Sequence, residues 1–210
     1  MLLPSHVYAS PRYAYWRELL QHWIFQVERS YRVTGTEHPC YSYKERTNVG
    51  LLAATAVANG WVALEECGTE KRTSESDESS PGRSDLRLWR EKRFHEIEAK
   101  FLRIALKSES STRLERSAES SLEEAIRALD TGAKFSRRVA LNFVVPTVSS
   151  AQYERLGEEH IRVLLADASK SILKSTKPSF FASAFPGKAP VNGQPKRVSL
   201  GIYVFGREPE

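Results

Sequence analysis

A chain of 210 residues, 40% of them apolar, is long enough to bury one hydrophobic core and short for two, so the sequence predicts a single domain over residues 1–210. The 31 lysine and arginine residues outnumber the 26 acidic ones, and the net charge of +5 suits a polyanionic partner such as DNA or RNA. No segment approaches the ~20 apolar residues of a membrane span and no signal-peptide pattern is present, so we expect a cytoplasmic protein with no membrane partner. Cys40 and Cys67 have neither disulfide-scaffold nor zinc-site spacing, which predicts buried free thiols.

The first third of the chain predicts two helices and a strand. Within residues 12–31 an apolar stripe recurs at steps of three and four, the period of an amphipathic helix, at Trp16, Leu20, Trp23, Val27 and Tyr31. A second helix, rich in leucine and alanine, is expected over residues 43–58, with Asn59 and Gly60 as its C-terminal stop. A short strand over residues 61–67 follows.

Residues 68–84 contain no large apolar side chain and many serines and charges, so we expect a mobile polar insertion there. The two short runs 85–90 and 94–101 come next. Because only three residues separate them, they are compact enough for a β-hairpin.

A second polar stretch, residues 107–121, leads into a helix expected to continue through Leu129 and to stop at Thr131 and Gly132. Residues 138–145 (RVALNFVV) then form the strongest predicted strand. Their density of β-branched and aromatic side chains is typical of a strand buried on both faces.

A long helix is expected over residues 151–175, because one broad face of that segment is apolar. Two more strands are expected, at residues 179–185 and 198–205, on either side of a glycine- and proline-rich loop at 186–195. The order of predicted elements describes an α/β protein with a central mixed β-sheet flanked by helices.

The predicted hairpin separates charged from apolar side chains. If Glu91 and Lys92 form its turn, Arg90 pairs with Arg93, and Asp85 lies across from Glu98. Side chains alternate along a strand, so the two faces of the hairpin differ. The predicted charged face carries Asp85, Arg87, Trp89, Phe94, Glu96, Glu98 and Lys100, and the predicted core face carries Leu86, Leu88, Ile97, Ala99 and Phe101.

Two carboxylates that face each other on neighbouring strands repel unless a cation lies between them. Mg²⁺ or Mn²⁺ is the natural occupant because both bind carboxylate oxygens, so Asp85 and Glu98 are predicted metal ligands. Lys100 points to the same face, where it is expected to orient an attacking water or to neutralise charge that develops on a phosphate.

These residues resemble the motif of the PD-(D/E)xK nuclease superfamily, which has the restriction-endonuclease-like fold. In that superfamily an Asp opens one strand, a Glu-x-Lys tripeptide lies on the next, and a preceding helix often adds another acid. Here Asp85 in GRSDLRLW and Glu98 and Lys100 in HEIEAKF match, with Glu45 as an additional metal ligand, while Ser84 stands in the place of the proline. The resemblance covers about half of the chain. It implies a Mg²⁺- or Mn²⁺-dependent nuclease acting on DNA or RNA, with Asp85, Glu98 and Lys100 as catalytic residues.

Other interpretations of the same residues stay open. A solvated surface hairpin explains the charges as well, since Arg87 opposite Glu96 is an ordinary cross-strand ion pair. A non-catalytic nucleic-acid-binding or protein-interaction scaffold of the same fold, in a homodimer or larger complex, is a second alternative. A third is an enzyme that uses this site on another substrate.

Two neighbouring acids and one histidine complete the candidates. Glu65 and Glu66 end the first predicted strand, and either can replace Glu45 as the extra acid. His95 falls on the Leu88 side of the hairpin, so we expect it to pack in the core rather than to act as a general base.

Overall fold

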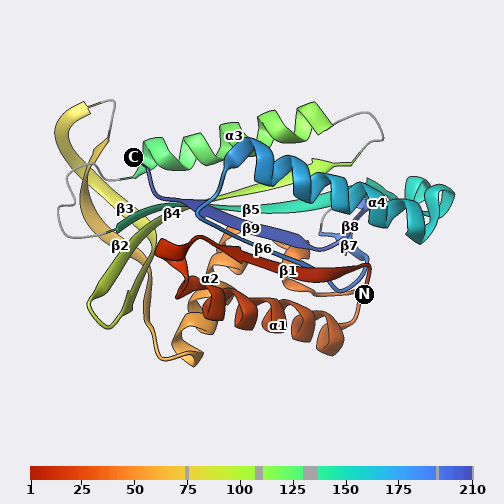
Figure 1. Ribbon diagram of the computed structural model, residues 1–210, viewed down its shortest axis with the longest axis horizontal. Coiled ribbons are helices and arrows are strands. Elements are labelled where there is room, and N and C mark those ends of the chain that lie inside the picture. Colours follow the sequence, from red (N-terminus) through yellow and green to blue (C-terminus); the bar gives the residue numbers. More distant parts are fainter. Residues whose placement is uncertain (74–75, 107–110, 130–136, 193, 210) are drawn as a thin grey trace.

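A mixed β-sheet forms the centre of the computed structural model, which describes residues 1–73, 76–106, 111–129, 137–192 and 194–209. The strand order is β1-β6-β9-β5-β4-β3-β2, with β7 and β8 attached beside β5 (Figure 1). Only β4 and β5 run parallel, and the other described pairs are antiparallel. The elements in chain order are β1 (Leu3–Ala9), α1 (Trp16–Thr34), α2 (Glu45–Ala58), β2 (Val62–Thr73), β3 (Ser76–Arg90), β4 (Arg93–Ala105), α3 (Ser111–Ala128), β5 (Arg137–Ser149), α4 (Ser150–Thr176), β6 (Phe180–Phe185), β7 (Ala189–Val191), β8 (Gln194–Ser199) and β9 (Ile202–Arg207).

Helices cover both faces of the sheet, so the molecule has three layers. In Figure 1, α1 and α2 lie below the sheet and α3 and α4 lie above it. Because strand side chains alternate, β5 supplies both cores: Val139 and Leu141 pack toward α1 and α2, and Ala140 and Val144 toward α3 and α4. The prediction of an α/β fold with a mixed sheet between helices is confirmed.

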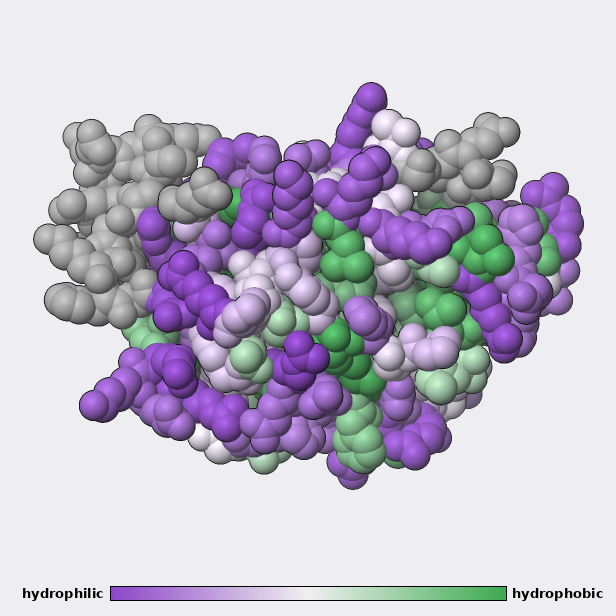
Figure 2. Space-filling view, in the orientation of Figure 1, coloured by the Kyte–Doolittle hydropathy of each residue, from purple (hydrophilic) through white to green (hydrophobic). Residues whose placement is uncertain are grey.

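The predicted stripe of α1 forms the centre of the first core. Trp16, Leu20, Trp23 and Val27 are each 0% exposed, and the ring of Trp16 stacks on Phe180 of β6 with centroids 4.2 Å apart. Burial of two indole rings from one helix against the sheet is a large hydrophobic contribution. On the other side of the sheet, the outer surface over α3 is largely hydrophilic (Figure 2).

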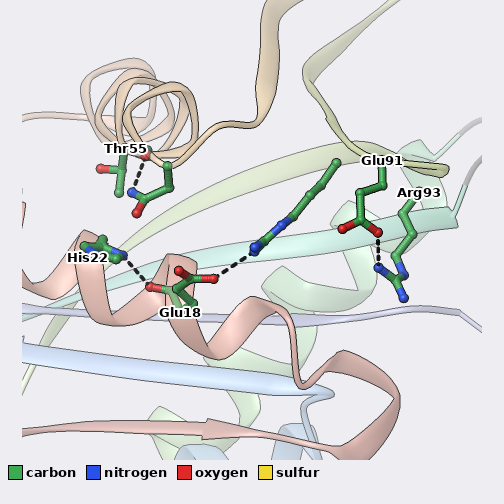
Figure 3. Close-up of polar contacts among 7 residues, drawn as sticks. Glu18, His22, Thr55, Glu91 and Arg93 are labelled. Atoms are coloured by element: carbon green, nitrogen blue, oxygen red, sulfur yellow. Dashed lines mark hydrogen bonds and ion pairs between the residues drawn. The ribbon is translucent and has the colours of Figure 1, made fainter.

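The predicted boundaries of the second helix and of the hairpin are close to the observed ones. Helix α2 ends at Ala58, and Gly60 has a φ of +77°, a left-handed conformation that glycine adopts without strain. Contacts at the hairpin turn fix its position: Arg90 donates to Glu18 of α1 at 3.0 Å, and Arg93 to Glu91 at 3.4 Å (Figure 3). Both cysteines are free thiols, and Cys40 is buried as predicted, whereas Cys67 is only half-buried.

The expectation of a polar loop at residues 68–84 is wrong. Strands β2 and β3 extend into this segment as a two-stranded ribbon, in which Gly68 pairs with Arg83 and Thr73 with Ser76. The two strands of a ribbon are joined by backbone hydrogen bonds, which do not depend on apolar side chains. A lack of apolar residues indicates only that the segment does not contribute to a hydrophobic core. Polar composition therefore misidentified paired strands as a loop.

Three other expectations need correction. The stretch 107–121 is helical from Ser111, because serine and charged residues are tolerated on the exposed side of an amphipathic helix. The strand expected at 198–205 is divided into β8 and β9 at Gly201, and part of the loop at 186–195 belongs to β7 and β8. Strand β1, which pairs with β6, was not predicted at all.

Helix α4 covers the predicted range, but it is interrupted at Gly157, whose φ is +71°. The helix stop expected at Thr131 and Gly132 lies outside the described residues. In the part of the chain that the structure describes, no helix is both long and apolar enough to cross a membrane.

Candidate functional site

Strands β3 and β4 separate at the residues that the sequence singled out. Their register is the predicted one, from Arg90 opposite Arg93 to Leu86 opposite Ile97, where the described pairing ends. Beyond that point β3 stays with β2, and β4 stays with β5. The predicted Asp85–Glu98 pair would be the next one, so the structure places both acids where the strands part.

A carboxylate replaces the missing strand at the exposed edge of β4. Oδ2 of Asp85 accepts a hydrogen bond from the backbone N–H of Ala99 at 2.8 Å. The backbone N–H of Phe101, two residues further along the same edge, favours the charged form of Glu45 at the start of α2. Backbone donors at a strand edge need such partners, which explains why acids from two other elements gather here.

The electrostatic interactions of Glu45 show which groups lie around it. Burial raises the pKa of its carboxyl first, the negative charges of Asp85 and Glu124 raise it further, and the positive charge of Lys100 lowers it. Charged side chains from β3, β4 and α3 therefore act on Glu45 of α2. A neighbourhood of three acids with one lysine between them is costly in an ordinary surface and typical of functional sites.

Glu98 belongs to the same region but is more deeply buried. It is 5% exposed, and by strand alternation it points with Lys100 toward α3, opposite to the apolar Ile97 and Ala99. The separation of a core face from a charged face on the hairpin is thus confirmed for these residues.

A pocket opens beside these groups, between the start of α2, strand β4 and helix α3. Its volume is about 570 Å³, and acidic, basic and hydroxyl side chains line it, among them Glu45, Lys100, Arg116, Ser120 and Glu124. Lys100 Nζ lies 3.4 Å from Oε1 of Glu124. The pocket therefore offers both cationic and anionic groups to a ligand.

Nearer the hairpin turn, the charged face carries an ion pair between Arg87 and Glu96. Arg87 donates to Oε1 of Glu96 at 3.0 Å, and Ser84 donates to the same oxygen at 2.8 Å. Because Glu96 and Glu98 are only 3% and 5% exposed, the interpretation of this face as a solvated surface is wrong at these two positions.

The two remaining acids belong to β2, the strand that pairs with β3. Glu66 forms ion pairs with Arg83 at 3.0 Å and Arg46 at 3.6 Å, and Glu65 is exposed beside Gly50 of α2. Glu45 is thus the acid that interacts with Asp85.

His95 is packed in the core, as expected. It is 0% exposed, and its Nε2 lies 3.2 Å from the hydroxyl of Tyr15. Burial, together with the positive charges of Arg137 and Arg93, lowers its pKa to about 4. The imidazole is therefore neutral at physiological pH and lies on the opposite side of the sheet from Glu98.

Sequence reasoning missed the contribution of α3, namely Glu124 and Arg116. The available signal was the four-residue spacing of Arg116, Ser120 and Glu124, which places them on one side of a helix. Reading residues 107–121 as a polar stretch concealed that spacing.

Among the described residues, no group of three or more His, Cys, Asp or Glu side chains could hold a metal ion. The chain also has no match to known proteins by which to assign the site: no family model, no curated protein and no solved structure matches it.

Proposed function

We propose that this protein is a metal-dependent phosphodiesterase that hydrolyses DNA or RNA, with Asp85, Glu98 and Lys100 as its catalytic residues. The observation that carries the proposal is the meeting of Glu45, Asp85 and Lys100 at the point where β3 leaves β4. An acid at the start of one strand, a Glu-x-Lys tripeptide on the next and an acid from the preceding helix are the parts that the resemblance to the PD-(D/E)xK superfamily implies.

The topology around the site supports the same proposal. The elements α2, β2, β3, β4, α3 and β5 follow one another as helix, three strands, helix and strand, with β4 parallel to β5. That order is the one implied by a restriction-endonuclease-like fold, in which the first three strands form a meander. We infer this fold for the central part of the chain.

The donor chemistry of the candidate ligands suits Mg²⁺ or Mn²⁺. Asp85, Glu98 and Glu45 offer only carboxylate oxygens, the donors that these hard cations prefer. Among the described residues these acids do not form a group that could hold a metal ion, so binding would require them to move together. Burial, and after it the negative charges of Asp85 and Glu124, raises the pKa of Glu45, and a divalent cation would relieve the repulsion between the acids. A bound metal ion would supply Lewis-acid stabilisation of a phosphate and a more acidic water.

The residues of the chain would then have distinct tasks. Lys100, whose side chain is 29% exposed, lies on the pocket side and would neutralise charge on a phosphate oxygen or orient the attacking water. Glu124 holds the ammonium group in place through its ion pair. Asp85 is fixed by the N–H of Ala99, so one of its oxygens has a defined position before any ligand arrives.

The test uses variants that keep the local hydrogen bonds. Asp85→Asn retains an oxygen acceptor for the Ala99 amide while it removes the charge, and Lys100→Met retains the aliphatic chain. Both should reduce cleavage of single-stranded and double-stranded DNA and RNA with Mn²⁺ by about 100-fold or more. Lys170→Met, at a lysine of α4 whose side chain is 79% exposed, is the matched control and should cleave like the parent.

If the parent cleaves none of these substrates, or if Asp85→Asn and Lys100→Met cleave as fast as the parent, the proposed function is wrong. The chain would then be better explained as a non-catalytic nucleic-acid-binding or protein-interaction scaffold. One observation favours that second candidate: Asp85 and Lys100 already have protein partners, the Ala99 amide and Glu124. Calorimetric titration with Mn²⁺ distinguishes the enzyme from the scaffold. The enzyme should show heat of Mn²⁺ binding that disappears in Asp85→Asn, and the scaffold should show none.

A further inference from the structure

Three strands expose an apolar surface next to the candidate site, on the α3 side of the sheet. The registers of β2, β3 and β4 place Val62 beside Trp89 and Trp89 beside Phe94, and Leu64 in the next row beside Arg87. We call Val62, Leu64, Trp89 and Phe94 the aromatic platform. Directly paired residues of antiparallel strands share a face, so the four side chains form one continuous patch.

The platform is open to solvent over β2. Val62 is 57% exposed and Leu64 is 50% exposed, and both are among the few large apolar side chains of the described residues with such exposure. Helix α3 lies on this same face but packs over β4 and β5 and against α4. A contiguous exposed apolar patch marks an interaction surface more often than isolated exposed apolar residues do.

The rings of Trp89 and Phe94 give the platform its shape. They stack with centroids 4.7 Å apart and an interplanar angle of 8°. Phe94 therefore covers one face of the indole, and the other face lies on the side of Val62. A flat ring that lies over Val62 and Leu64 can extend this stack.

The platform lies in line with the candidate catalytic residues. Trp89 and Asp85 are on the same strand and face, four residues apart, which corresponds to about 13 Å along β3. Single-strand binding folds contact at least about four nucleotides, a length that easily spans this interval. The same extended strand can thus place a phosphate at Asp85 and a base at Trp89.

Basic side chains lie at both ends of this path. Arg83, whose side chain is 63% exposed, is two residues before Asp85 on β3 and forms an ion pair with Glu66 at 3.0 Å. Lys92 is exposed in the turn after Trp89, next to the 73% exposed Glu91. Both cationic groups are accessible to the phosphates of a bound strand, although each has an acid beside it.

We propose that the aromatic platform binds the unpaired bases of a single-stranded nucleic acid and delivers the strand to the site at Asp85 and Lys100. This inference rests on the proposed function, since it names the form of the substrate. Bases are accessible for stacking only where they are not paired, so the platform selects single strands or unpaired segments over a blunt duplex.

The test measures binding separately from cleavage. A fluorescein-labelled dT12 oligonucleotide and a 12-base-pair blunt duplex are titrated with Lys100→Ala protein in EDTA, and fluorescence anisotropy reports the affinity. In that background Trp89→Leu should weaken dT12 binding about 5- to 100-fold, because the stacking of a base on an aromatic ring is lost. Trp89→Phe should retain most of the affinity, and duplex binding should stay unchanged.

Two further variants guard against a folding defect. Val62→Glu places a carboxylate at a 57% exposed position and should also weaken dT12 binding, without loss of any core contact. Phe25→Leu removes an aromatic ring that is 49% exposed on α1, on the other side of the molecule, and should bind like the Lys100→Ala parent.

Equal dT12 affinity of Trp89→Leu, Val62→Glu and the parent would overturn the inference. A parent dimer in sedimentation that dissociates in Trp89→Leu would overturn it too, because the platform would then bind a second copy. If the wild-type chain cleaves nucleic acid but Trp89→Leu leaves the dT12 affinity unchanged, the proposed nuclease activity is supported and the proposed role of the platform is wrong. If the platform variants weaken dT12 binding and no cleavage occurs, the platform stands and the nuclease fails.

Discussion

Acid is expected to destabilise this protein through one buried histidine. The imidazole of His95 is 0% exposed, contacts the rings of Tyr15 and Trp16, and shares a hydrogen bond with the Tyr15 hydroxyl. Burial, followed by the positive charges of Arg137 and Arg93, lowers its pKa from 6.5 to about 4.

The sign of the effect follows from which state binds the proton first. Because the folded-state pKa lies below the unfolded-state pKa, the unfolded chain takes up the proton as the pH falls below 6.5. The stability contributed by neutral His95 is complete above pH 6.5 and is lost as the pH falls toward 4. A difference of this size corresponds to roughly 3 kcal/mol in all, of which about 2 kcal/mol is lost between pH 7 and pH 5.

Urea denaturation at pH 7 and at pH 5, followed by tryptophan fluorescence, measures this loss. His95→Phe keeps an aromatic ring but removes the titration, so its free energy of unfolding should fall by about 2 kcal/mol less than that of the parent over this interval. His160→Gln, at an exposed histidine of α4, should behave like the parent. If His95→Phe and the parent lose the same free energy between the two pH values, the reasoning is refuted.

Three more variants test a buried ion pair, a strained turn between β8 and β9, and an exposed ion pair. Arg87→Met leaves the 3% exposed Glu96 without its guanidinium and should lower the free energy of unfolding in urea by about 2–4 kcal/mol; a variant as stable as the parent would contradict a buried ion pair. Gly201→Ala should destabilise by about 3 kcal/mol or prevent folding, because φ is +141° and a Cβ would meet a carbonyl oxygen of β6; normal thermal unfolding would show that the turn is different. Glu124→Gln should change the unfolding free energy by less than about 0.5 kcal/mol, since its ion pair with Lys100 is largely solvated; a loss above about 1 kcal/mol would argue for a structural role.

The sequence predicts the register of the hairpin because several short-range constraints agree. A turn at Glu91 and Lys92, apolar side chains on one face and charges on the other leave only one pairing that buries Leu86, Leu88 and Ile97 together. A shift by one residue would exchange the two faces. The location of the predicted site residues follows directly from that register.

What the sequence does not predict depends on long-range contacts. The segment 68–84 is paired through backbone hydrogen bonds, which leave no trace in the hydrophobicity of the sequence. Strand β1 forms because β6 offers it an edge, although β1 ends at Ala9 and β6 begins only at Phe180. Glu124 reaches the site because α3 crosses β4, and no local pattern encodes that crossing.

The edge of β4 gives Asp85 and Glu45 a structural reason to be present, and that reason has to be weighed before a catalytic one. Amides at positions 99 and 101 would be unpartnered without an acceptor, so part of the role of both acids is to replace a strand. A serine or an asparagine would satisfy the same amides without mutual repulsion. The use of two charged acceptors, with the ammonium group of Lys100 close to them, is therefore the feature that edge capping does not explain. For this reason Asp85→Asn, which keeps the acceptor and removes only the charge, separates catalysis from folding more cleanly than Asp85→Ala does.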